Sequence, residues 1–390
     1  MSNFAPGVNP QLLRWARERA GYSLVDVAQA MGKGPELVEL WETGKAVPTY
    51  NQLEKLAYSL YKRPIALFFF AEPPEEPDPR ESFRTLPGFE IDSLLPDTRH
   101  AIRQGQAFQL SLVELTGGLN LAPRKIFQDV VLSPQEDVTH AAVAVRNYLR
   151  VPLAEQFKWP SSEKALEIWR EHVQEVGIFV FKRAFKQEDV SGFSLADGQF
   201  PLIFLNNSTA KARQAFTLFH ELAHILVGTS SITKRSDAYV RDLAGTSRTI
   251  EVFCNSLTAE ILVPSYDFET RLSDTTDVRD QVEPLARLYK VSREVILRKL
   301  LDRQAIDPFY YEATVNQWIQ EFKRSRQVRS PGGDYYATQA SYLGEPYLGL
   351  AFTKYYQGAI AIDQLASHLN IKAKSVPGLE QAFLKKAAAR

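Results

Sequence analysis

Hydrophobic residues recur at helical spacing through most of the chain, with one interval in which the spacing changes to that of β-strands. Apolar positions three and four residues apart predict short amphipathic helices over residues 9–61 and mainly helical structure over residues 97–175. Between these regions, the stretch AEPPEEPDPRESFR is rich in proline and acids, so it cannot continue a helix or form a central strand. We therefore expect a linker there.

Three β-rich runs follow, GIFVFKRAF, VSGFSLADG and FPLIFLNN, and Asp-Gly and Asn-Asn turn signals accompany them. The next run, KARQAFTLFHELAHILVG, predicts a long helix that ends at Gly228. We expect the polar residues 229–247 to form a loop, and RTIEVFCNSLTAEILVP to form a helix that Pro264 stops. VEPLARLYKVSREVILRKLLDR then predicts a pair of helices. The expected fold class is α+β, mostly α.

The boundaries of the first helices can be predicted from single residues. Gly21 is expected to end the first helix, and Ser23 is expected to cap the second. Pro35 suits the first turn of the third helix and Gly44 suits its end. The buried side of the second helix is expected to consist of Val25, Val27, Ala28 and Met31.

Composition excludes several classes of protein. The 390 residues hold 46 Lys plus Arg and 46 Asp plus Glu, so any contact with DNA needs a local basic patch. The single cysteine, Cys254, rules out an internal disulfide and favours a reducing compartment. The stretch MSNFAPGVNPQLLRW does not resemble a signal peptide, and the apolar stretch PIALFFFAEPP is too short to span a bilayer. We expect a cytoplasmic protein with no membrane partner.

The segment FHELAHILVG indicates metal chemistry. His220 and His224 are four residues apart on a predicted helix, so both imidazoles can face one zinc ion. Glu221 is turned away from direct ligation but is close enough to take a proton from water at the metal and pass it to a leaving amine. The alternative is a buried helix that merely contains two histidines. A histidine pair flanking a glutamate on an apolar helix is, however, costly without a metal.

A catalytic zinc site needs a third protein ligand. Spacing alone leaves five candidates, which are His172, Asp237, Asp242, Glu251 and Glu260. Glu251 is expected at the opening of a helix, and Glu260 lies nine residues further on, close to the opposite face. These two glutamates therefore cannot both bind the ion.

FTLFHELAHILVG followed by IEVFCNSLTAEILVP resembles the ImmA/IrrE family of zinc metallopeptidases, whose second helix reads E-x-x-A-N-x-[FL]-A-[AT]-E-x-L-x-P. By this resemblance Glu251 matches the third zinc ligand, and Asn255 and Pro264 match the characteristic asparagine and proline. Cys254 replaces the usual alanine and is expected to be a packed small residue. The resemblance covers roughly residues 95–375 and implies a zincin-like domain with a small β-sheet and the HExxH helix. LARLYKVSREVILRKL also looks like a helix–turn–helix, but we expect it to pack within the peptidase region.

LRWARERAGYSLVDVAQAMGKGPELVELWETGKAVPT resembles the Cro/C1-type (XRE-like) helix–turn–helix of phage-repressor-like regulators. Trp41, Glu42, Gly44 and Pro48 match the W-E-x-G-x-x-x-P ending of that family. The resemblance implies a five-helix domain whose recognition helix enters the major groove of DNA, with a homodimer reading paired half-sites.

The side chains expected to contact DNA are both basic and acidic. Glutamate can accept a hydrogen bond from a cytosine amino group, and lysine and arginine can contact phosphates. The expected DNA contacts are Arg17, Arg19, Lys33, Glu36, Glu39 and Lys45. Because two acids would face a polyanion, the alternative is a module used for dimerisation or partner docking.

These patterns predict four parts: a repressor-like helix–turn–helix domain (1–70), a linker (71–95), a zinc metallopeptidase domain (96–307) and a helical region (308–390). In the last part we expect the tyrosines to pack a small domain, with a nucleic-acid stacking surface as the alternative. These tyrosines are Tyr335, Tyr336, Tyr342, Tyr347, Tyr355 and Tyr356.

The combination of parts implies regulation. The leading hypothesis is a DNA-binding regulator or antitoxin-like protein whose zinc endopeptidase domain hydrolyses a regulatory partner, either a repressor or a cognate toxin. The alternative is a non-catalytic DNA-binding regulator or antitoxin whose zinc site is structural or sensory. The intact Glu221 favours the enzyme, since a structural site has no use for an additional carboxylate there.

Overall fold

The computed structural model describes residues 4–76, 78, 83, 91–234, 240, 243–273, 277–327 and 333–388. The chain forms two compact units. One comprises Met1–Gln104 with Phe185–Gln187, and the other comprises Gly105–Ala184 with Glu188–Arg390. The four-part organisation expected from the sequence is finer than this division and stays a prediction.

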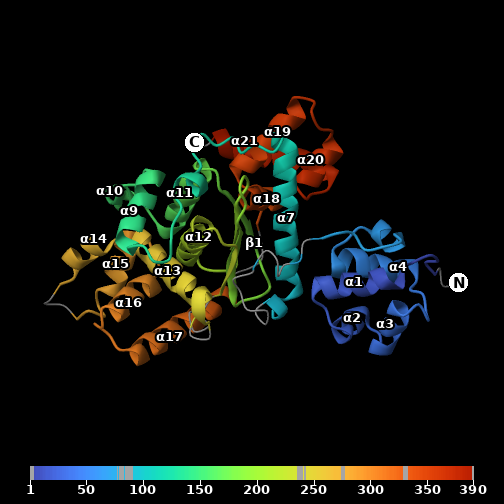
Figure 1. Ribbon diagram of the computed structural model, residues 1–390, viewed down its shortest axis with the longest axis horizontal. Helices are drawn as coiled ribbons and strands as arrows, with labels where there is room; N and C mark the ends of the chain where they lie inside the picture. Colours follow the sequence, from blue (N-terminus) through green and yellow to red (C-terminus); the bar gives the residue numbers. More distant parts are fainter. Residues whose placement is uncertain are drawn as a thin grey trace. The chain divides into compact units, whose positions relative to one another are not determined.

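The first unit is built mainly from short helices (Figure 1). They are α1 (Pro10–Ala20), α2 (Leu24–Met31), α3 (Pro35–Glu42), α4 (Tyr50–Glu54), the π-helical segment η1 (Lys55–Tyr61) that continues α4, and the 3-10 segment η2 (Ile65–Phe69). Their apolar sides meet in one core, in which Leu12, Val38 and Trp41 are almost completely buried. The five-helix arrangement expected here is therefore confirmed.

The helix ends predicted from single residues are confirmed at Gly21 and Ser23, whereas one prediction of burial on the face of α2 is wrong. Gly21 ends α1 in the left-handed region with φ of +79°, where a side chain would be strained. Ser23 caps α2 and forms a reciprocal pair of hydrogen bonds with Asp26. The expected burial of Val25 is wrong, because its side chain is 60% exposed. Val25 lies one position beyond Leu24, so it is rotated away from the face that α2 buries.

The second unit contains a four-stranded sheet with the order β1-β3-β2-β4. The strands are β1 (Phe179–Arg183), β2 (Val190–Leu195), β3 (Leu202–Asn206) and β4 (Ser231–Lys234). β1 pairs parallel to β3, whereas β2 pairs antiparallel to β3 and to β4. The first three strands match the β-rich runs, but the expectation of a loop throughout residues 229–247 is wrong. Strand β4 is only four residues long and forms by pairing with β2, so local sequence gives little sign of it.

The helices of the second unit pack against this sheet or against one another (Figure 1). Those before and between the strands are α7 (Pro96–Thr116), which crosses the division between the units, α8 (Ile126–Asp129), α9 (Val138–Leu149), α10 (Leu153–Lys158), α11 (Ser162–Glu175) and α12 (Lys211–Leu226). Those after the strands are α13 (Gly245–Leu262), α14 (Ser265–Arg271), α15 (Val282–Tyr289) and α16 (Arg293–Asp302). α12 packs against β2 and β3 on one side and against α11 and α13 on others.

The expected helix pair over LARLYKVSREVILRKL corresponds to α15 and α16. Leu285 and Tyr289 of α15, and Ile296 and Leu300 of α16, belong to the same hydrophobic core as α12 and α13. The pair is therefore a packing element of the second unit, as the sequence predicted.

The remaining helices are α17 (Pro308–Gln327), α18 (Tyr335–Leu343), α19 (Glu345–Tyr356), α20 (Ile362–His368), the short 3-10 segment η4 (Ala373–Ser375) and α21 (Val376–Ala388). The expectation for the tyrosines is correct only in part. Tyr347 is buried against Phe181 and Phe108, whereas Tyr335 and Tyr356 are 52% and 61% exposed. Among the helices that the structure describes, none combines the length and the apolar character needed to cross a membrane.

Candidate metal centre

Helix α12 carries the histidine motif into the interior of the second unit. Its last three turns contain neither glycine nor proline, and Gly228, with φ of +80°, follows its end as expected. His220, Glu221 and His224 are at most 1% exposed. Apolar side chains of α11 and α13 surround this helix. The three polar side chains must therefore find their hydrogen-bond and charge partners among themselves and a few nearby polar groups.

Glu251 of α13 completes a cluster with the two histidines. The Nε2 atoms of His220 and His224 are 3.1 Å apart. The Glu251 carboxylate oxygens lie 3.3 Å from Nε2 of His220 and 3.2 Å from Nε2 of His224. All three side chains are buried, and one ligand atom from each falls within 4.8 Å of the others.

α13 starts earlier than the sequence indicated. It begins at Gly245, so Glu251 lies in its second turn and not at its opening. This position aims the carboxylate across the packed α12–α13 interface toward the two imidazoles.

The chemistry of this donor set fits a metal ion. Two imidazole nitrogens and one carboxylate oxygen form a ligand set that zinc uses in catalytic sites. Burial opposes the ionisation of Glu251, but attraction to His224 and hydrogen bonds with both histidines outweigh it and hold the pKa of Glu251 well below its usual value. An ionised carboxylate therefore faces two imidazoles in a dry interior, where a bound cation satisfies all three groups.

Two of the other candidates for the third ligand, His172 and Glu260, have other partners. His172 of α11 lies 3.7 Å from a carboxylate oxygen of Glu175. Glu260 accepts hydrogen bonds from Ser265 and Lys299. Asp237 and Asp242 lie outside the residues that the structure describes.

Cys254 is fully buried one turn from the cluster. Burial, with the negative charges of Glu251 and Glu221, raises the pKa of its thiol well above the usual value. A thiol held in its neutral form is a poor metal ligand. This agrees with the expected packing role.

Glu221 is held by strand β4. The hydroxyls of Ser231 and Thr233 donate hydrogen bonds to its two carboxylate oxygens. Sequence reasoning missed both residues because they lie in the segment expected to be a loop. Their alternation around Ile232 was the available signal, since alternate residues of a strand share a face.

A hydrogen-bonding contact and a small void lie beside the cluster. The Thr229 hydroxyl lies 3.1 Å from Nδ1 of His224, which fixes the orientation of that ring. Beside His220 is a void of about 20 Å³, whose lining includes Thr233 and Asn255. Asn255, identified through the family resemblance, therefore lies next to the cluster.

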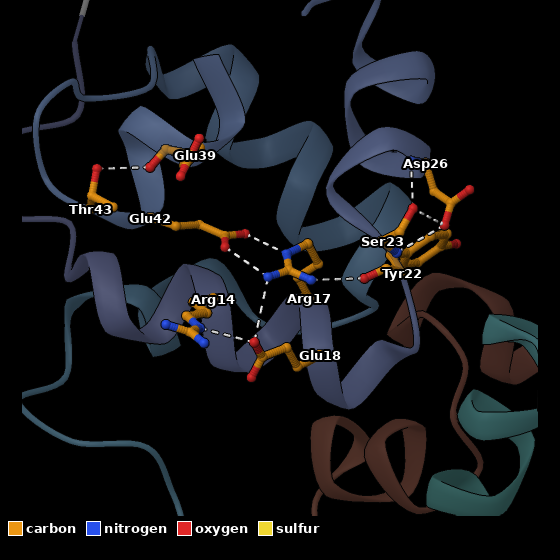
Figure 2. Close-up of polar contacts among 9 residues, drawn as sticks. All are labelled: Arg14, Arg17, Glu18, Tyr22, Ser23, Asp26, Glu39, Glu42 and Thr43. Carbon is orange, nitrogen blue, oxygen red and sulfur yellow. Dashed lines mark hydrogen bonds and ion pairs between the residues drawn. The ribbon is translucent and has the colours of Figure 1, made fainter. Parts of the chain in front are cut away.

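Two of the residues expected to contact DNA serve the fold of the first unit. Figure 2 shows the Arg17 guanidinium between Glu42 and the carbonyl of Tyr22, with donor–acceptor distances of 2.7 and 2.9 Å to the Glu42 carboxylate and 3.0 Å to the carbonyl. Arg19 donates a hydrogen bond to the carbonyl of Glu76. Contact of Arg17 with a phosphate would require its pair with Glu42 to open.

The other four expected DNA contacts lie at the surface. Glu36 and Glu39 are exposed on α3, and Lys33 and Lys45 are exposed just before and just after this helix. The α3 surface thus presents charges of both signs. DNA contact by these residues stays a prediction.

Two comparisons match the chain to known families. Residues 173–301 match the family described as an IrrE N-terminal-like domain, which is a peptidase family, and residues 11–60 match a helix-turn-helix domain. The fusion of these two domains, expected from the resemblances, is therefore confirmed. All four residues of the HExxH and Glu251 cluster lie within the first match. No curated protein matches the chain closely enough to be informative.

Proposed function

We propose that this chain, which joins a helix-turn-helix domain to an IrrE-like metallopeptidase-like domain, is a DNA-binding transcriptional regulator with zinc-dependent endopeptidase activity. One observation carries the enzymatic part. His220, His224 and Glu251 converge in the interior, with the carboxylate of Glu221 on the same helix. This constellation suits metal-assisted hydrolysis of a peptide bond.

Each residue has a distinct role in this proposal. His220, His224 and Glu251 would hold zinc, which when bound makes water acidic and polarises a substrate carbonyl. Glu221 accepts the proton as general base and returns it to the leaving amine as general acid. Ser231 and Thr233 orient the Glu221 carboxylate.

The sheet supports a protein substrate. β4 is one of the two outer strands of the described sheet, and its residues Ser231 and Thr233 contact Glu221. An extended peptide can pair with an outer strand through main-chain hydrogen bonds. A substrate paired there would place its backbone next to the general base.

The regulatory part rests on the helix-turn-helix match. We propose that a cytoplasmic homodimer binds an operator through α3, and that the peptidase domain acts on a repressor or a cognate toxin. Lys33 and Lys45 are the exposed cations beside α3. They are the proposed phosphate contacts.

A second candidate is a non-catalytic regulator or antitoxin whose zinc site is structural or sensory. The lack of space for a substrate at the site favours this second candidate. The three ligands are at most 3% exposed, the adjoining void measures about 20 Å³, and Glu221 already accepts two hydrogen bonds. Peptidase activity therefore requires the region around β4 to open for substrate.

Glu221→Gln separates the two candidates. The amide keeps the shape of the side chain but cannot take a proton, so we expect cleavage of a partner protein to fall by a factor of about 100 or more. The measurement is gel electrophoresis of the proteins encoded by the neighbouring genes, each incubated with each variant. Lys158→Met is the control, because Lys158 is an exposed residue of α10 with a side chain 73% accessible.

Zinc content should be the same in the wild type and in Glu221→Gln, since Glu221 is not a ligand. Full regulatory function in cells carrying Glu221→Gln would contradict the peptidase and favour the non-catalytic regulator.

A further inference from the structure

The second unit contains a cavity of about 650 Å³ that shares no residue with the metal cluster. Its walls come from α11, from β1 at the edge of the sheet, from the segment between α7 and α8, and from α19 and α21. Its volume is in the range that accommodates a small organic molecule. The proposed peptidase activity makes no use of this cavity.

Lys182 of β1 lines the cavity with a buried amine. Lys182 is only 8% exposed. Among the residues that the structure describes, none forms a hydrogen bond or an ion pair with its amine. Burying a cation without a partner costs free energy. A buried amine such as that of Lys182 therefore indicates a place where a bound anion is expected.

The surroundings of Lys182 add to this cost. Burial lowers its pKa to about 7, and the positive charges of Arg170, Lys211 and Lys386 act in the same direction. Glu167 of α11 opposes them but does not compensate. An anion close to the amine would therefore stabilise its charged form at neutral pH.

Of the other cations at the cavity, Arg150 is exposed to solvent, and Arg124 donates a hydrogen bond to the carbonyl of Tyr148. Arg170 donates hydrogen bonds to the carbonyls of Val180 and Ser341. Lys386 lies 3.0 Å from the carboxylate of Glu345. Lys182 is thus the buried charge on which a ligand can act.

The rest of the lining defines the kind of anion. The apolar part of the wall contains Leu121, Pro123, Phe179, Phe200, Pro346 and Leu350. The acids Glu167, Glu171, Glu175 and Glu345 also line the cavity, and because their repulsion grows with the charge of the ligand, they disfavour an anion with two negative charges more than an anion with one. A singly charged anion with an apolar body suits both features.

We propose that this cavity is a binding site for a small monocarboxylate with an aromatic or aliphatic body, whose carboxylate pairs with the ammonium group of Lys182. The apolar body lies against Phe179 and Phe200, which enter from β1 and from the segment before β3. This site is independent of zinc and of peptide hydrolysis.

The test uses the full chain and titration calorimetry with benzoate, phenylacetate and hexanoate. Their neutral amides and phenyl phosphate serve as comparison probes. We expect the acids to bind at least about tenfold more tightly than the amides, because only the acids bring a negative charge to the buried ammonium group. Lys182→Met should remove this preference, Lys182→Arg should retain part of it, and the exposed control Lys158→Met should behave as wild type.

A second measurement does not depend on a substitution at this position. A limiting amount of an amine-acetylating reagent near pH 7 should modify Lys182 readily in the wild type, and a bound acid should slow that modification, as followed by mass spectrometry of peptides. The proposal is overturned if acids and amides bind equally, or if no acid in the series binds or protects Lys182. It is also overturned if a folded Lys182→Met retains the wild-type preference.

Discussion

Glu221 differs from the three proposed metal ligands in the groups that hold its side chain in place. The ligands face one another, whereas the Glu221 carboxylate is held by two hydroxyls from a neighbouring strand. A general base must lie within hydrogen-bond reach of the proton that it takes, so the position of this carboxylate affects the rate directly. Under the proposed mechanism, Ser231 and Thr233 are therefore positioning residues.

This role predicts the effect of removing the hydroxyls. Thr233→Val keeps the shape of the side chain but removes its hydrogen bond. Combined with Ser231→Ala it should lower kcat on the order of tenfold, because the Glu221 carboxylate remains present but is no longer held in one orientation. KM should change little, since the hydroxyls orient the base and do not bind substrate. Steady-state cleavage assays measure both constants. Thr233→Ser should restore most of kcat, and an effect confined to KM would contradict the positioning role.

At the residue scale, the sequence predicted the part of the site that is local in the chain. His220, Glu221 and His224 follow from spacing on one helix. Spacing left Glu251 as one of five candidates, and only the family resemblance selected it. Ser231 and Thr233 reach Glu221 through the pairing of β4 with β2, and their alternation around Ile232 is too short a pattern to specify that pairing.

At the scale of elements, long periodic segments were predicted well and the short strand was not. α12 ends where Gly228 indicated, because a glycine in the left-handed region satisfies the end of a helix. α13 extends back to Gly245, through polar residues that carry no hydrophobic period. The first turn of α13 thus forms because the backbone hydrogen bonds of the helix continue through these residues. Hydrophobic patterns locate such a helix start poorly.

A buried ion pair joins two of these elements. Lys299 of α16 donates hydrogen bonds to Glu260 of α13, at 2.8 Å, and to Ser265, at 2.9 Å. Although burial opposes ionisation, the hydrogen bonds from Lys299 and Ser265 lower the pKa of Glu260 below its ordinary value. The pair therefore stabilises the fold above the unfolded-state pKa, and this stabilisation is lost as pH falls through the folded-state pKa.

Lys299→Met is expected to reduce the free energy of unfolding by about 3 kcal/mol at pH 7, because it leaves a buried carboxylate without its cation. The difference from the wild type should shrink as pH falls below the ordinary pKa of 4.5, where the carboxyl becomes protonated. Urea unfolding at several pH values measures this difference. Arg298→Met, which breaks an exposed pair with Asp302 on the same helix, should cost under about 1 kcal/mol. A cost for Lys299→Met that does not vary with pH would contradict the assignment.

At the scale of the whole molecule, amino-acid composition excluded an internal disulfide but did not identify the function of the chain. A formal net charge of zero gave no sign of a nucleic-acid partner, and the helix-turn-helix domain was found through the W-E-x-G-x-x-x-P pattern. The packing of α15 and α16 in the core shows that a similar helix pair contributes to the fold of the second unit. The function of such a pair thus depends on which faces remain exposed.

The exposed face of α3 predicts weak, salt-dependent DNA binding. With Arg17 paired to Glu42, few cations remain to contact phosphates. We expect the chain to retard DNA from its own promoter region in a mobility-shift assay at low salt, with binding lost steeply as salt rises. The double substitution Lys33→Glu and Lys45→Glu should weaken binding at every salt concentration, whereas Lys158→Glu should not. Absence of retardation at low salt would instead indicate a module for dimerisation or partner docking.

The metal content of the purified chain tests the account most directly. Elemental analysis should find about one zinc ion per chain in the wild type and in Glu221→Gln, because a single cluster of ligands is expected to hold it. Glu251→Gln and His224→Ala should each lose most of the metal while remaining folded by circular dichroism. A wild-type chain without stoichiometric metal after purification in zinc-containing buffer, or a Glu251→Gln variant that binds zinc as tightly as the wild type, would contradict the proposed centre.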